Sequence, residues 1–171
     1  ISIPDTVTSI GDAAFYECSG LTSISIPDTI TSIGKYTFCK CSSLTSISIP
    51  GSVTSIGHAA FYECSSLTSI SIPDSVTSIS EYAFEDCSSL TSISIPDSVT
   101  SIGTSAFKNT PWLENARKEN PLVIVNYILI DGEKASGNIS IPDTVTSIGD
   151  FAFYKCSSLT SISIPGSVTS I

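Results

Sequence analysis

The tetrapeptide Ile-Ser-Ile-Pro recurs at a constant spacing, and this recurrence constrains the fold more than any other feature of the chain. Successive copies begin 23 residues apart, except for one step of 46 residues between Ile93 and Ile139. Because that step equals two periods, a divergent copy occupies residues 116–138, and the 171 residues hold seven full periods and a ten-residue remainder. A unit of this length cannot enclose a core alone, whereas stacked copies can, so the sequence predicts a solenoid. The copies begin at Ile1, Ile24, Ile47, Ile70, Ile93, Ile139 and Ile162.

Each repeat, counted from its first isoleucine as position 1, has the form ISIPDSVTSIGxxAFxxCSSLTS. In LTSISIP, Leu and Ile alternate with hydroxyl residues, which is the period of a strand with one buried face, and the proline at position 4 ends that strand. The stretch VTSI predicts a second short strand. Glycine at position 11, as in Gly11, Gly34, Gly57, Gly103 and Gly149, is expected to supply a positive φ at the next corner. The apolar spacing of xxAFxxC predicts one turn of α- or 3₁₀-helix.

Stacking places each position above the same position of the neighbouring repeat. The predicted fold class is a mainly β, right-handed solenoid with parallel strands and short α or 3₁₀ turns, and it forms a single domain over residues 1–171. Both ends of the chain cut through the repeated unit, so we expect a fragment of a longer protein whose uncovered ends favour end-to-end self-association.

The decapeptide CSSLTSISIP fits the leucine-rich repeat pattern C-x-x-L-x-x-I-x-I, and the whole unit resembles the BspA-like family of bacterial and protozoan surface proteins. The resemblance covers essentially the whole chain. It implies a module of a large secreted or surface-attached protein that adheres to host proteins or to other cells, and hence an extracellular or cell-surface location. It also implies that ligands meet the concave face of the sheet.

Charge and hydropathy exclude some partners. The net charge is −9, which disfavours nucleic acid because binding a polyphosphate relies on Lys and Arg. No apolar run approaches the roughly 20 residues of a membrane span, and no signal peptide is visible.

Residues 108–138 depart from the repeated unit. Thr110 and Pro111 predict the start of a helix that ends at Pro121, followed by two strands that turn near Asn126 and Tyr127. Trp112 and Tyr127 form a possible contact patch. The alternative is that Trp112 covers the core where the usual Cys and Leu are missing.

Five of the six cysteines share position 18 and predict a column of thiols that face one way. Such a column favours reduced, buried thiols over a disulfide framework, although disulfides between neighbouring repeats stay open as an alternative. Cys39 lies off the column and is expected to be exposed and reactive. With one histidine, His58, and no C-x-x-C pair, we expect no metal site and no cofactor.

Two serine rows on the solvent side of the first strand are the candidate ligand-binding residues, because this would be the concave face. The row of aspartates at position 5 could bind cations, but aspartate after proline is also typical of a turn. No Ser-His-Asp arrangement or carboxylate pair indicates catalysis. The serines are Ser23, Ser25, Ser46, Ser48, Ser69, Ser71, Ser92, Ser94, Ser161 and Ser163.

These observations favour a noncatalytic binding or adhesion module whose partner is a protein or a glycan. The alternative is a structural spacer or accessory domain of a larger protein, because near-identical repeats suit a spacer. Ice binding is a remote third, since ice-binding sheets generally carry rows of threonine.

Overall fold

A computed structural model describes residues 1–171, and the chain divides into two compact units, Ile1–Leu113 and Glu114–Ile171. Each unit is a stack of coils with short parallel strands and a period of 23 residues, and the chain contains one α-helix. The predicted fold class, a mainly β solenoid, is confirmed. That all 171 residues form one domain stays a prediction.

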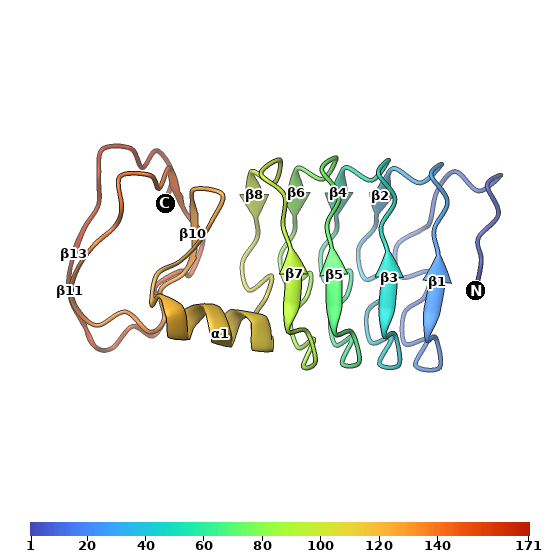
Figure 1. Ribbon diagram of the computed structural model, residues 1–171, viewed down its shortest axis with the longest axis horizontal. Coiled ribbons are helices and arrows are strands. Elements are labelled where there is room, and N and C mark those ends of the chain that lie inside the picture. Colours follow the sequence, from blue (N-terminus) through green and yellow to red (C-terminus); the bar gives the residue numbers. More distant parts are fainter. The chain divides into compact units, whose positions relative to one another are not determined.

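The first strand of each repeat builds one side of the N-terminal unit. The strands β1 (Ser23–Ser25), β3 (Ser46–Ser48), β5 (Ser69–Ser71) and β7 (Ser92–Ser94) lie side by side in Figure 1. Each has the sequence Ser-Ile-Ser, in which the isoleucine faces the core and both serines face solvent. Parallel ladders join β1 to β3 and β5 to β7, with every residue opposite its equivalent 23 positions away. The alternation predicted for this stretch is therefore confirmed.

The stretch VTSI forms the second strand, although only its last two residues pair. The strands β2 (Ser32–Ile33), β4 (Ser55–Ile56), β6 (Ser78–Ile79) and β8 (Ser101–Ile102) make one continuous parallel sheet. Their isoleucines and the valines three positions earlier, such as Val53 and Val76, are buried or nearly so.

The xxAFxxC segment forms a run of hydrogen-bonded turns, so the prediction of a helical turn was wrong. Ala59 and Glu63, at positions 13 and 17, have φ values of 50° and 55°, in the left-handed region. Their N–H groups, and that of Phe61, donate to carbonyls of the next repeat at 2.8–3.0 Å. A helix would use these donors within its own turn, whereas here alternate N–H groups join neighbouring repeats.

The glycines at position 11 do not have positive φ, so that prediction was also wrong; Gly137 is the glycine that does. The reason for glycine is the close approach of the preceding repeat. A Cβ on Gly57 would lie 2.7 Å from the carbonyl carbon of Gly34, and one on Gly103 would lie 2.4 Å from the N of Glu81. Absence of a side chain lets the backbones approach here.

Aromatic rings form the centre of the N-terminal core. Phe15, Phe38, Phe61, Phe84 and Phe107 stack in sequence, with ring centroids 5.2–5.7 Å apart. Columns of buried Leu, Ile and Val surround them. Stacking of identical side chains is what the 23-residue spacing predicted.

The helix and hairpin predicted for residues 108–138 are confirmed. The helix α1 (Pro111–Glu119) begins after Thr110, whose Oγ1 accepts a hydrogen bond from the N–H of Leu113 at 3.2 Å. The strands β9 (Val123–Val125) and β10 (Ile128–Asp131) pair antiparallel across Asn126 and Tyr127, which have φ values of 46° and 68°. Two successive positive φ values are the signature of a type I′ hairpin turn.

The C-terminal unit returns to parallel pairing after this hairpin. The strand β10 pairs with β12 (Ser147–Ile148), and β11 (Gly137–Ser140) pairs with β13 (Leu159–Ser163). Its core is a small cluster of apolar side chains: Leu122, Leu129, Ala135, Ile141, Val145, Ile148 and Ala152.

Candidate interaction surfaces

The serines of β1, β3, β5 and β7 form a surface that we call the serine face. All eight are exposed, and they lie in two in-register rows. None of these eight hydroxyls makes a hydrogen bond to protein, whereas threonines in the preceding column do: the Oγ1 of Thr45 donates to the carbonyl of Thr22 at 3.3 Å, and Thr91 repeats this contact with Thr68. The serine hydroxyls are therefore available to a partner.

Ser161 and Ser163, in the C-terminal unit, are exposed but have different neighbours. They lie opposite Asn138 and Ser140. The Oγ of Ser161 donates to the Oδ1 of Asn138 at 2.8 Å. The divergent repeat thus interrupts the serine row in this unit and occupies one of its hydroxyls.

Trp112 and Tyr127 belong to different units. Trp112 is half-buried, and its ring meets that of Phe107 edge to face at 4.9 Å, at the end of the phenylalanine stack. Tyr127, in the hairpin turn, is 62% exposed. The packing of Trp112 supports a core role for this side chain, and a contact patch formed by these residues stays a prediction.

The cysteines are all free thiols. Cys41, Cys64 and Cys87 are fully buried, and burial raises their pKa values, that of Cys41 to about 11. The prediction for Cys39 was wrong: it is 3% exposed, because the turn segment places it under the neighbouring repeats, and burial raises its pKa as well. Its thiol is therefore protected and mainly protonated at neutral pH.

No part of the chain groups three or more His, Cys, Asp or Glu side chains in a way that could hold a metal ion. The aspartates at position 5, including Asp28 and Asp74, are exposed residues of turns. His58 pairs with Glu81, at 3.3 Å from Nδ1 to Oε2. No helix is both long enough and apolar enough to cross a membrane.

A second surface was missed by the sequence reasoning. It consists of positions 12, 13, 16 and 17 of the repeats in residues 1–113, and we call it the turn face. These four positions are the unspecified ones in the repeat formula; position 12, for example, is Asp12, Lys35, His58, Glu81 and Thr104. The concentration of variation at four positions was the signal that could have found this surface.

Contacts between repeats order one edge of the turn face. The His58 ring lies between those of Tyr36 and Tyr82, which it meets edge to face at 5.1 and 5.3 Å. The Oδ1 of Asp12 accepts a hydrogen bond from the N–H of Lys35 at 2.8 Å.

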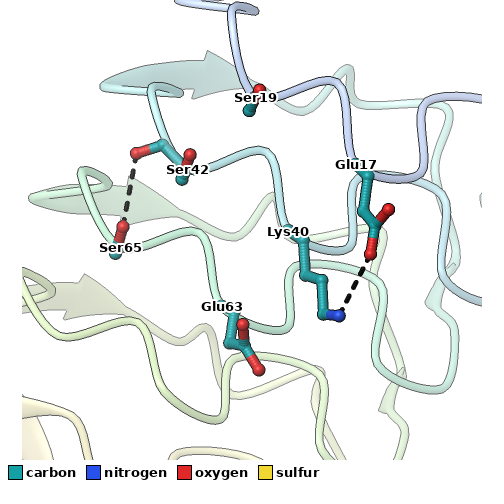
Figure 2. A pocket seen from close by; sticks show the side chains of 6 residues that line it. All are labelled: Glu17, Ser19, Lys40, Ser42, Glu63 and Ser65. Atoms are coloured by element: carbon teal, nitrogen blue, oxygen red, sulfur yellow. Dashed lines mark hydrogen bonds and ion pairs between the residues drawn. The ribbon is translucent and has the colours of Figure 1, made fainter.

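Charged side chains form the other edge. Lys40 pairs with Glu17 at 3.1 Å, and its Nζ lies 5.8 Å from the centre of the Tyr16 ring. Figure 2 shows Glu17, Lys40 and Glu63 in one row beside the serines that follow the cysteines. Together they line an open depression of about 400 Å³, formed by Glu17, Ser19, Lys40, Ser42, Glu63 and Ser65. A depression this open can accept a side chain of a partner.

Parallel strands, a 23-residue period and an inward column of Leu, Ile and Cys define a leucine-rich repeat solenoid. The chain belongs to the BspA-type leucine-rich repeat family: the pattern described as BspA type Leucine rich repeat region matches residues 1–122 and 131–171, in six copies. The family resemblance noted in the sequence is thereby confirmed.

Solved structures give the same fold. A leucine-rich repeat protein of T. pallidum is 26% identical, with a TM-score of 0.65, over 95% of this chain and 68% of its own. A leucine-rich cell surface protein of Faecalibacterium prausnitzii is 30% identical, with a TM-score of 0.54, over 98% of this chain and 47% of its own. The pneumococcal vaccine antigen PcpA shares the fold at 19% identity and a TM-score of 0.57, over 98% of this chain and 60% of its own. A search of curated proteins found no match.

Proposed function

We propose that this chain is a noncatalytic binding module of a secreted or cell-surface protein, and that the serine face contacts a protein or glycan partner. Eight exposed, in-register serine hydroxyls with no protein partner are the observation that carries the proposal. Ordered hydroxyls can both donate and accept hydrogen bonds. A likeness to a leucine-rich protein named for the cell surface supports the location.

Negative charges introduced on the serine face by substitution test this proposal. Beads coated with the chain are counted on cultured epithelial cells, and the variant Ser46→Glu, Ser48→Glu, Ser69→Glu and Ser71→Glu is compared with the unsubstituted chain. We expect adhesion to fall at least tenfold, because four carboxylates replace neutral donors. Periodate treatment of the cells separates a glycan partner, which it destroys, from a protein partner.

A charge-matched variant controls for repulsion by the whole molecule. Thr8→Glu, Thr31→Glu, Thr77→Glu and Thr100→Glu change exposed residues at position 8, away from the serine face. Adhesion of this control should persist. Equal loss in both variants, or no loss in the serine variant, would reject the serine face as the site.

A spacer is the second candidate, and the identity of the Ser-Ile-Ser strands favours it, because a specific site usually varies between repeats. Coated beads that adhere no more than blank beads would support the spacer.

A further inference from the structure

Exposed aromatic side chains gather at two repeat positions. Apart from Tyr127 and isoleucines of the terminal repeats, every large exposed hydrophobic residue lies at position 13 or 16 of a repeat. In residues 1–113 these are Tyr16, Tyr36 and Tyr82, which are 36–42% exposed. Tyrosine is enriched among the residues that dominate protein interfaces.

Position 13 is a costly place for such a ring. Tyr36 and Tyr82 have φ values of 56° and 59°. The left-handed region is unfavourable by about 1–2 kcal/mol for residues other than glycine, and Asn or Asp is the usual occupant when glycine is absent. In the neighbouring repeats the same position is Ala13 and Ala59, so the fold does not need an aromatic ring there. The conformation itself belongs to the fold, since Ala13, Ala59 and Ser105 adopt it as well, so the tyrosine rings are additions that the repeat does not require.

The charges around the rings favour a cationic partner. The side chains of the turn face include six carboxylates and three lysines. Ion pairs with lysines engage Glu17 and Glu85, and Glu81 contacts the Nδ1 of His58. Glu63 and Asp86 have no cationic partner within the chain, although Asp86 accepts a hydrogen bond from Asn109 at 2.8 Å.

The rings themselves already accept cations of the chain. The Nζ of Lys40 lies over Tyr16, and in the C-terminal unit that of Lys155 lies 5.2 Å from the centre of the Tyr154 ring, at the same repeat position. A guanidinium is a better partner for an aromatic face and for a carboxylate than an ammonium, because it is planar and donates two parallel hydrogen bonds.

We propose that the turn face of residues 1–113 is a docking surface for a protein that presents an arginine-rich segment, with Tyr16, Tyr36 and Tyr82 as aromatic anchors and Glu63 and Asp86 as charge partners. A neutral glycan would leave these carboxylates unused, and an anionic one would be repelled by the net charge of −9. This surface is distinct from the serine face and does not depend on it.

Binding of a defined peptide tests the proposal. Fluorescein-labelled (Arg-Gly)₅ is titrated into the full chain by fluorescence anisotropy, with the citrulline analogue as the uncharged control. Tyr36→Ala with Tyr82→Ala should weaken binding by about 5- to 30-fold, since an exposed cation–π contact contributes about 0.5–1 kcal/mol. Both tyrosine substitutions introduce alanine, the residue that the neighbouring repeats carry at position 13, so the fold should persist. Glu63→Gln with Asp86→Asn should weaken binding about tenfold.

NMR spectra of the protein with isotope-labelled tyrosine locate the contact. The ring resonances of Tyr16, Tyr36 and Tyr82 should shift on titration, whereas that of Tyr127, which is exposed but off the turn face, should not. Undiminished binding by the tyrosine variant, or shifts of similar size at Tyr127, would overturn the proposal, since either would mean that charge alone attracts the peptide. Equal binding of the citrulline peptide would also overturn it, since the guanidinium charge would then play no part. Binding of an oligosaccharide array at the same tyrosines without peptide binding would overturn the partner class. Concentration-dependent dimers that Tyr36→Ala and Tyr82→Ala abolish would instead identify a second copy as the occupant.

Discussion

The Sγ of Cys64 donates a hydrogen bond to the carbonyl oxygen of Phe38, 3.1 Å away and 26 positions earlier in the chain. The same contact recurs from Cys41 to Phe15 and from Cys87 to Phe61, at 3.1 and 3.0 Å. Each thiol thus fills the corner of its own repeat and binds the backbone of the repeat before it. A thiol suits this apolar corner because it acts as a small hydrophobe with a weak donor.

Thiol labelling should report this arrangement directly. In the native protein at pH 7.5, Cys18, the one exposed cysteine, should react with a maleimide first, and Cys39, Cys41, Cys64 and Cys87 should react only after unfolding. Mass spectrometry of tryptic peptides identifies the labelled sites. Denatured protein without reductant should yield six free thiols, and a count of two or fewer would mean that disulfides join the repeats.

Stability should fall as the pH rises above the pKa of an unfolded cysteine, about 8.5. Burial raises the folded-state pKa of Cys64 and Cys87, so between the unfolded and folded values the native state holds protons that the unfolded state releases. Each such thiol costs about 1.4 kcal/mol of unfolding free energy per pH unit in that window, and none below it. Urea unfolding at pH 7.5, 9 and 10 measures this. Cys64→Ala with Cys87→Ala should flatten the dependence, and an unchanged slope would contradict the assignment to these thiols.

The sequence predicted the stack well because identical side chains at a fixed interval leave few alternatives. The Ser-Ile-Ser strands, the buried thiols Cys41, Cys64 and Cys87, and the Asn126-Tyr127 hairpin follow from local pattern and spacing. The column was predicted to be buried throughout, but Cys18 is exposed and Cys156 is half-buried, because they lie in the first and the last full repeat. The predictions of an exposed Cys39 and of a helical turn were wrong for the same reason. Hydrogen bonds from Ala59, Phe61 and Glu63 to the next repeat set the turn conformation, and such contacts between repeats are not a local property of the sequence.

The surfaces were only half predictable. Exposure of the serines follows from strand alternation, so residues such as Ser46 and Ser69 could be named in advance. Variation at four repeat positions could have located the turn face, but not its conformation, because the positive φ of Tyr36 and Tyr82, and the His58 ring between them, depend on how neighbouring repeats pack.

Alanine at Gly57 should be destabilising, and alanine at Gly11 should not. Both glycines occupy position 11, but a Cβ on Gly57 would lie 2.7–2.8 Å from backbone atoms of the preceding repeat, while one on Gly11 meets nothing within 4 Å. Overpacking of this kind costs about 1–3 kcal/mol. Ser80 occupies position 11 of the next repeat, so a Cβ can be accommodated at this position, which places the expected cost of Gly57→Ala near the lower end. Thermal unfolding of the two variants provides the comparison, and equal midpoints would contradict close approach as the reason for glycine.

Removal of Arg117 should destabilise the C-terminal unit. Its guanidinium, 9% exposed, makes two hydrogen bonds to Asp131, at 2.9 and 2.6 Å, and a third to Glu133 at 2.7 Å. It therefore joins α1 to β10 and to the turn that follows β10. Arg117 also pairs with Glu114, so Arg117→Met leaves Asp131 and Glu114 without a cation, whereas Glu133 keeps Lys134. Asp131 is the more buried of the two, and breaking a buried pair in this way costs about 3–5 kcal/mol.

Lysine in this place keeps the charge but loses the fork of two parallel donors, so Arg117→Lys should recover only part of the loss. The matched control is Lys118→Met, because Lys118 is exposed and its one contact is a 3.4 Å hydrogen bond to Asn115. Hydrogen exchange should show faster amide exchange in β9 and β10 for Arg117→Met and no change for Lys118→Met. Native exchange rates in both variants would mean that the carboxylates find solvent and that Arg117 does not hold this unit together.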